Sequence, residues 1–220
     1  MTDRIWYACY GSNLCYDRFM TYIAGGTISS KGHDVKEVGC IDKSKPVRDM
    51  PIDIPYRLVF IDNSPRWTGG YCFLDPVYDE SAHTKGRAYD ISVEQFHDVL
   101  VQENNGLSVP DIDLSSLEEW NSIEIRPEAR YGKLLVVGEF DGIPAVTFTY
   151  TDGWAKENDL SPKMPAEAYL DVIRRGLGEI GMESSEIDKY LADRIPGYAK
   201  STTSSLYFRQ AHNNKEGTPC

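Results

Sequence analysis

The chain has 220 residues, of which 41% are hydrophobic and 11% aromatic, and its formal net charge is −11. This composition predicts one globular domain, and the acidity argues against nucleic acid or an anionic membrane as the main partner. No apolar run approaches the roughly 18 residues that span a bilayer. The first residues lack a signal-peptide pattern, and the five scattered cysteines are typical of a reduced protein. We therefore expect a cytoplasmic protein.

The first predicted strand, residues 5–10, runs directly into Gly11-Ser12-Asn13. Its residues are mostly β-branched or aromatic, which suits a pleated sheet. Gly11 lets the chain turn where a side chain would clash, and the two residues after it add short hydrogen-bonding groups. Such a loop either holds an anionic or polar group or is an ordinary turn, and the residues alone leave both open. Cys9 alternates with Tyr10 and is expected to face a core rather than to act as a nucleophile.

Strand-like segments and turn-rich connections alternate through the first half of the chain. We predict a short helix over residues 16–23 and strands over 56–61, 71–74 and 86–91. Asp75-Pro76 is expected to end the second of these strands. Residues 25–55 are rich in Gly, Lys, Asp and Pro and show little periodicity, which predicts a mostly irregular insertion.

A helix is predicted to follow, from residue 93 to about residue 104. Ser92 and Gln95 have the spacing of a capping box at its start, and Asn105-Gly106 provides a stop signal at its end. Residues 108–122 then read as a loop or second insertion.

Glu103 is placed on an unexpected face of this helix. Phe96, Leu100 and Glu103 are spaced by four and three residues, so they share one helical face, and the first two belong to the core. A carboxylate on a core-facing stripe is costly unless it has partners or is protonated, and such groups serve as general acids and bases. The alternative is that the stripe has already reached solvent at Glu103.

The last part of the chain predicts a hairpin followed by helices. Strands are expected over 123–125, 133–140 and 143–151, with Asp141-Gly142 as a turn, and helices from Pro165 toward Gly181 and after Ser184-Ser185. Strands in the middle and helices at the end predict an α+β fold, a small mixed or antiparallel β-barrel with flanking helices. We expect one domain over residues 1–209 and a polar tail over 210–220.

Two segments resemble a known family. Tyr10-Gly11-Ser12-Asn13-Leu14, at the end of the first strand, resembles the signature loop of the γ-glutamylcyclotransferase-like superfamily. The strand from Gly86 to Ile91, followed by a helix that ends in Gln102-Glu103-Asn104, resembles the pair of elements that delivers the family's catalytic glutamate. Trp67-Thr68-Gly69-Gly70 also resembles a family segment that precedes a strand.

Tyr131, which opens a strand, and Tyr169 match tyrosines that line the family pocket. The resemblance covers the chain from residue 5 to about residue 191. Residues 25–55 and 108–122 depart from it, because they are longer than the compact family core needs.

The resemblance implies a barrel with a cavity at one end and an intramolecular reaction. The α-amine of a γ-glutamyl compound attacks its own γ-carbonyl, which gives 5-oxoproline and a free amine, with Glu103 as general acid and base. No metal and no cofactor is implied. The substrate-binding residues that the resemblance implies are Tyr10, Gly11, Ser12, Asn13, Leu14, Tyr131 and Tyr169.

Two other functions stay open at this point. The same site could cleave or transfer another amide, as an amidohydrolase or acyltransferase in which Glu103 activates water. The fold could also serve as a non-enzymatic module that binds a small molecule. The sequence decides neither the leaving amine nor whether the protein forms a homodimer.

Overall fold

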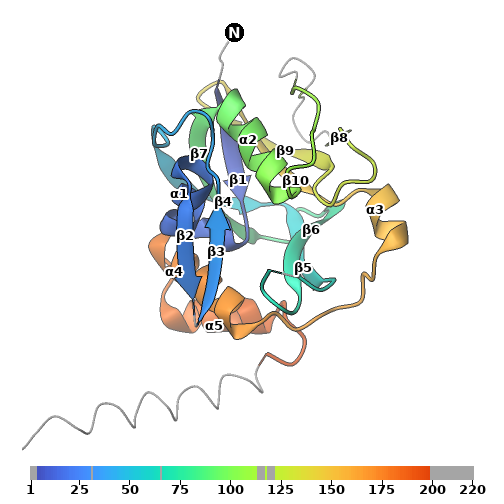
Figure 1. The fold of residues 1–220 in the computed structure, drawn as a ribbon. Helices are drawn as coiled ribbons and strands as arrows, with labels where there is room; N and C mark the ends of the chain where they lie inside the picture. The colour runs from blue at the N-terminus through green and yellow to red at the C-terminus, as the bar shows by residue number, and fades with distance from the viewer. Residues whose placement is uncertain (1–3, 31, 65, 113–116, 118–121, 199–220) are drawn as a thin grey trace, which may run out of the picture.

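The computed structural model describes residues 4–30, 32–64, 66–112, 117 and 122–198. The fold is α+β, as predicted, and is centred on a six-stranded sheet with the order β4-β7-β1-β10-β9-β8 (Figure 1). These strands are β1 (Arg4–Cys9), β4 (Asp49–Ile54), β7 (Thr84–Ser92), β8 (Ser122–Glu124), β9 (Lys133–Phe140) and β10 (Ile143–Thr149).

The main sheet is mixed. β1 pairs in parallel with β10, with Trp6 opposite Ala145, and antiparallel with β7. The remaining pairs are antiparallel. The β9–β10 hairpin turns at Asp141 and Gly142, whose φ angles of 56° and 73° are those that the predicted two-residue turn requires.

Two small sheets complete the strands: β2 (Gly26–Ser30) with β3 (His33–Glu37), and β5 (Tyr56–Ile61) with β6 (Tyr71–Tyr78). In the described part of the chain, hydrogen bonding therefore gives three sheets and not one closed barrel. The prediction of an irregular segment over 25–55 was wrong, because that segment forms β2, β3 and β4. β2 and β3 are short and largely exposed, so they lack the apolar alternation that indicates a strand. β4 does alternate, with Met50, Ile52 and Ile54 as its apolar residues, and this signal was overlooked among the surrounding polar residues and prolines.

β6 also runs past Asp75-Pro76, where we expected it to end. Its register against β5 shifts between Tyr56 and Leu58. Proline lacks a backbone N–H and is tolerated at such an irregularity, where a ladder hydrogen bond is already missing.

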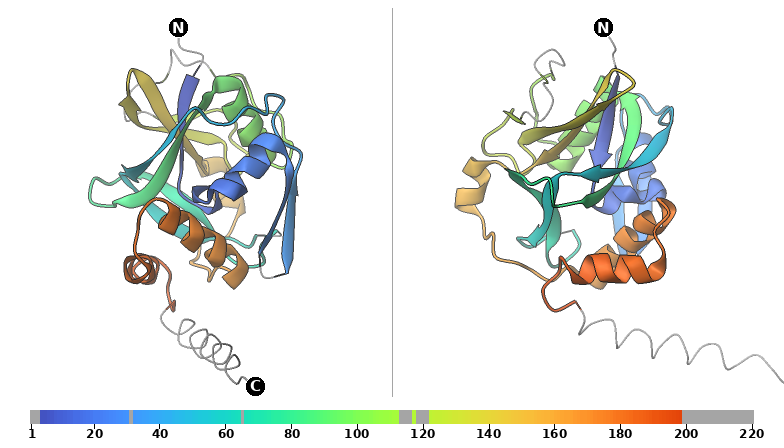
Figure 2. Two further views of the ribbon diagram at one scale, coloured as in Figure 1. Left: turned by 90° about the vertical axis from the view of Figure 1, so that its left-hand side faces the viewer. Right: turned by 180° about the vertical axis from the view of Figure 1, so that it is seen from behind.

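Five α-helices and one turn of 3-10 helix are described, and α2 begins with the predicted capping box of Ser92 and Gln95. Two details differ: α3, which Thr151 caps, was not predicted, and α5 is capped by Glu183 rather than by the serines after it. α2 lies over β1 and β7, while α4 and α5 lie together at the other end of the molecule (Figure 2). The helices are η1 (Ser12–Leu14), α1 (Tyr16–Ala24), α2 (Val93–Glu103), α3 (Asp152–Glu157), α4 (Glu167–Glu179) and α5 (Ser184–Ala192).

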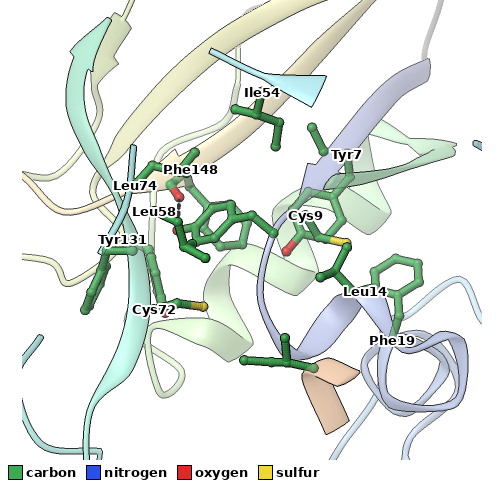
Figure 3. Close-up of a cluster of buried hydrophobic side chains, with 14 of the residues drawn as sticks. Tyr7, Cys9, Leu14, Phe19, Ile54, Leu58, Cys72, Leu74, Tyr131 and Phe148 are labelled. Atoms are coloured by element: carbon green, nitrogen blue, oxygen red, sulfur yellow. Dashed lines mark hydrogen bonds between the residues drawn. The ribbon is translucent and has the colours of Figure 1, made fainter. Parts of the chain in front are cut away.

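Aromatic side chains dominate the core between α2 and the sheet. The ring of Tyr7 lies 5.6 Å from that of Phe96 and is stacked on that of Phe148 at 5.2 Å. Cys9 is buried in the same cluster, as predicted, and the Tyr7 ring and the Cys72 sulfur point into it from β1 and from β6 (Figure 3). Among the described residues, no helix is both long and apolar enough to cross a membrane. The predicted tail over 210–220 lies outside the described residues.

Gly176 brings α4 into backbone contact with η1. A Cβ at this position would lie 2.4 Å from the Cβ of Leu14 and 2.4 Å from the backbone nitrogen of Cys15. Both are fixed by the fold, so only glycine lets the helix approach the loop this closely. Gly178, one half-turn further along α4, has nothing nearer than an Ile187 methyl group at 4.0 Å.

These two glycines give a matched test of the contact. We predict that Gly176→Ala lowers the free energy of unfolding by about 1–3 kcal/mol, because α4 must move away from η1. Gly178→Ala is predicted to stabilise by about 0.5–1 kcal/mol, because alanine favours the helix. Urea unfolding of both variants measures this, and equal effects would show that the α4–η1 contact is not tight.

Candidate functional site

A cavity of about 70 Å³ lies where η1, the start of β6, the end of α2 and α4 meet. By volume it holds roughly five water-sized groups. Seven of the eight predicted site residues line it: Tyr10, Gly11, Ser12, Asn13, Glu103, Tyr131 and Tyr169. Leu14 lies instead in the hydrophobic core, where it is 1% exposed, because η1 turns its side chain toward Gly176.

The loop of residues 11–14 is held from β7. The hydroxyl of Tyr89 donates to the carbonyl of Asn13 at 3.0 Å, and the guanidinium of Arg87 donates to the carbonyl of Leu14 at 3.0 Å. Arg87 also pairs with Glu179 on α4 at 2.7 Å. The strand that resembles the family's glycine-led strand therefore fixes the loop that resembles the family's signature loop.

Gly11 is required by space rather than by backbone conformation. Its φ angle is −116°, which any residue adopts, but an added Cβ would lie 2.6 Å from the sulfur of Cys72 and 3.2 Å from the hydroxyl oxygen of Tyr169. Cys72 and Tyr169 also contact each other, with 2.9 Å between sulfur and oxygen. The prediction that a side chain would clash at Gly11 agrees with this geometry.

Glu103 faces the loop across the cavity. The side-chain nitrogen of Asn13 donates to Glu103 Oε1 at 2.9 Å and to the hydroxyl of Tyr7 at 3.1 Å. The side-chain oxygen of Asn13 is buried and has no hydrogen-bond partner. Phe96 and Leu100 are fully buried, whereas Glu103 is half-buried, so the helical stripe opens into the cavity at its last turn.

The residue after the glutamate fixes the neighbouring wall. The side-chain oxygen of Asn104 accepts from the backbone N–H of Tyr131 at 3.0 Å, and its nitrogen donates to the Tyr131 carbonyl at 3.2 Å. This reciprocal pair joins the end of α2 to the start of β9. The pair ties the backbone next to Glu103 to the backbone of Tyr131, and both residues line the cavity.

The hydroxyl and thiol groups of the cavity are neutral at physiological pH. Burial raises the pKa of Tyr10, Tyr131 and Tyr169 well above the ordinary value, and the charge of Glu103 adds to the increase for each. Burial also raises the pKa of Cys72 to about 12. Glu103 is the one carboxylate among the described residues that line the cavity, so it is the strongest candidate for accepting a proton there.

Three arginines of the cavity wall were not predicted: Arg18, Arg66 and Arg130. Arg18 is 1% exposed and donates to Tyr22 at 2.7 Å and to Glu37 at 2.8 Å. Burial alone would lower the pKa of Arg18, but Tyr22, Glu103 and Glu37 raise it, so its charge is retained. In the sequence, Arg18 is marked only as a cation among apolar residues in the helix predicted over residues 16–23.

Trp67 also lines the cavity. It belongs to Trp67-Thr68-Gly69-Gly70, the segment that resembles one in the γ-glutamylcyclotransferase-like superfamily. Its ring lies 5.5 Å from that of Tyr169, and its backbone N–H donates to the hydroxyl of Ser64 at 3.0 Å. In the described part of the chain, no group of three or more His, Cys, Asp or Glu residues is placed to hold a metal ion.

Comparison with known proteins finds solved structures of low sequence identity and one partial sequence match. A solved γ-glutamyl cyclotransferase matches 86% of this chain and 87% of its own, with 16% identity and a TM-score of 0.49. A human protein described as uncharacterized matches 87% of this chain and 88% of its own, with 15% identity and a TM-score of 0.49.

A curated relative carries a name from another class of enzyme. Histone deacetylase 5 of Arabidopsis thaliana is 35% identical over 195 residues, which are 83% of this chain. The match spans only 29% of that protein's length, so it concerns one part of a longer chain. No family model matches the sequence.

The buried thiol predicts a pH dependence of stability. Because burial raises the pKa of Cys72 to about 12, the folded state holds this proton more tightly than the unfolded state. The resulting stabilisation is complete below the unfolded pKa, about 8.5, and is lost progressively as pH rises toward the folded pKa. Cys72→Ala should therefore flatten the alkaline fall in unfolding free energy by about 1.4 kcal/mol per pH unit. Urea unfolding at several alkaline pH values measures this. Parallel curves for both proteins would contradict it.

Proposed function

We propose that the protein is a γ-glutamylcyclotransferase-like enzyme, which cyclises a γ-glutamyl amide to 5-oxoproline and releases an amine. The observation that supports this most is the contact between Asn13, in the Gly11–Leu14 loop, and the carboxylate of Glu103. It joins the two segments that carry the resemblance to the family in one cavity. The resemblance covers most of the chain and concerns residues that are far apart in sequence.

The proposed reaction needs one proton acceptor and several donors. The neutral form of the substrate α-amine attacks the γ-carbonyl carbon and loses one proton to Glu103, so the new C–N bond closes a five-membered ring. The old C–N bond then breaks, and Glu103 returns the proton to the leaving nitrogen. The unpaired side-chain oxygen of Asn13 is a second acceptor for the N–H groups of the amine.

Neutral hydroxyls and backbone groups suit the other half of the chemistry. The oxygen of the γ-carbonyl gains negative charge in the tetrahedral intermediate, and fixed donors stabilise it without reorganisation. The resemblance assigns this role to the Gly11-Ser12-Asn13 backbone, with Tyr131 and Tyr169 as pocket walls. A packed cavity also keeps the glutamyl chain curled, which brings amine and carbonyl together.

The histone deacetylase name supplies no second candidate. It belongs to a protein of which this chain matches a minor part, and no contact in the cavity favours an acetylated substrate over a γ-glutamyl one. An amide hydrolysis at the same site would differ in its product, since water instead of the α-amine would attack the carbonyl.

The test is a panel of γ-glutamyl amino acids, γ-glutamyl amines, glutathione and an acetylated lysine peptide, with 5-oxoproline measured by mass spectrometry. We expect 5-oxoproline from at least one γ-glutamyl compound, and we expect Glu103→Gln to lower kcat by about a hundred- to ten-thousand-fold. Glu94→Gln is the matched control, because Glu94 lies on the same helix and is exposed. Turnover that survives Glu103→Gln would contradict the assigned role, and turnover of the acetylated peptide alone would contradict the reaction.

A further inference from the structure

Two of the cavity arginines share a single carboxylate. Arg18 and Arg66 both donate to Oε1 of Glu37, each at 2.8 Å, and both donate to the hydroxyl of Tyr22. The Glu37 side chain is 5% exposed, so this cluster is largely removed from water. One negative charge against two positive ones leaves this corner of the cavity with an excess of positive charge.

The third guanidinium, that of Arg130, has no carboxylate partner in the described part of the chain. It lies over the ring of Tyr71, with its central carbon 4.9 Å from the ring centroid, and its Nε is buried without a hydrogen-bond partner. The carboxylate of Asp62 accepts from the hydroxyl of Tyr71 and forms no ion pair with Arg130. A buried, unpaired guanidinium donor is costly, and an anionic ligand at this wall would offset the cost.

The charges of the cavity wall therefore do not cancel. The guanidinium groups of Arg18, Arg66 and Arg130 line the cavity together with the carboxylate of Glu103, and Glu37 pairs with the first two from behind the wall, which leaves one positive charge in excess. A γ-glutamyl amine carries one ammonium and one carboxylate and is neutral overall. A γ-glutamyl amino acid carries a second carboxylate on its leaving group and has one net negative charge, which complements the wall.

Resting on the proposed function, we propose that Arg130 binds the carboxylate of the leaving amino acid, so that the enzyme prefers γ-glutamyl amino acids over γ-glutamyl amines. Arg130 precedes Tyr131, whose backbone the Asn104 pair holds beside Glu103. Arg130 and Glu103 line the same small cavity, so in this proposal the leaving group takes its proton from Glu103 while its carboxylate meets the guanidinium. A planar fork of N–H donors matches a carboxylate in two-point contact.

A matched pair of compounds tests this residue. γ-Glutamyl-alanine and γ-glutamyl-ethylamine have the same glutamyl group and leaving groups that differ chiefly by a carboxylate. We expect the wild type to prefer γ-glutamyl-alanine in kcat/KM by about 10- to 100-fold, the range for hydrogen bonds to a charged group. Arg130→Gln is expected to remove the preference by lowering kcat/KM for γ-glutamyl-alanine only. Arg130→Lys is expected to keep part of it.

Arg126→Gln is the control variant, because Arg126 lies four residues away, pairs with Glu128 and does not line the cavity. It should keep the full preference. Equal losses on both compounds in Arg130→Gln would overturn the proposal, since Arg130 would then hold the glutamyl half or the fold. Equal kcat/KM values in the wild type would also overturn it.

Binding separates this proposal from the proposed reaction. If neither compound is turned over, the reaction fails, and calorimetric titration of the Glu103→Gln protein still decides the subsite. Tighter binding of γ-glutamyl-alanine that disappears in the Glu103→Gln, Arg130→Gln double variant supports it. Equal affinities for the two compounds, or a preference that persists in the double variant, contradict it.

Discussion

Asn13 is the residue on which the arrangement of the cavity depends. Its carbonyl accepts from Tyr89 on β7, and its side chain donates to Glu103 on α2, so one residue joins the sheet, the loop and the helix. It is 4% exposed, and both bonds are therefore stronger than they would be in water. If the loop moved, the carboxylate would lose its donor and β7 would lose its hold on the loop.

Close backbone packing fixes the position of the loop of residues 11–14. Gly176 lets α4 touch η1 from one side, and Gly11 lets Cys72 and Tyr169 approach it from another. These contacts at the two glycines involve no charged groups. They leave the loop little room to move, because protein interiors are packed as densely as crystals of small organic molecules. The polar groups of the cavity are therefore held in place by close packing at Gly11 and Gly176, two positions where a side chain would not fit.

The cavity wall contains buried charged groups that do not by themselves stabilise the fold. Arg18 and Glu37 are almost wholly buried, and replacing such pairs by apolar residues often stabilises a protein. We propose that their presence beside Glu103 serves the binding of the proposed substrate rather than the stability of the fold. The neutral tyrosines around them supply hydrogen bonds without competing for the proton.

Local signals in the sequence predicted the strand, loop and helix that carry the site. The cavity residues that depend on contacts between distant parts of the chain could not be predicted in this way. The capping box at Ser92 and the spacing of Phe96, Leu100 and Glu103 placed the carboxylate, because helical periodicity is a property of neighbours in the chain. Arg18 could not be assigned in this way. Its burial depends on Glu37, which reaches it through a hairpin of short, polar strands that the sequence pattern did not reveal.

The central claim is that the substrate's own amine, and not water, attacks the carbonyl. The most direct measurement is mass spectrometry of the products formed from γ-glutamyl-alanine in ¹⁸O-labelled water. Intramolecular attack predicts 5-oxoproline without label, in an amount equal to the alanine released. Glutamate that carries one labelled oxygen would contradict the account, because water would then have been the nucleophile.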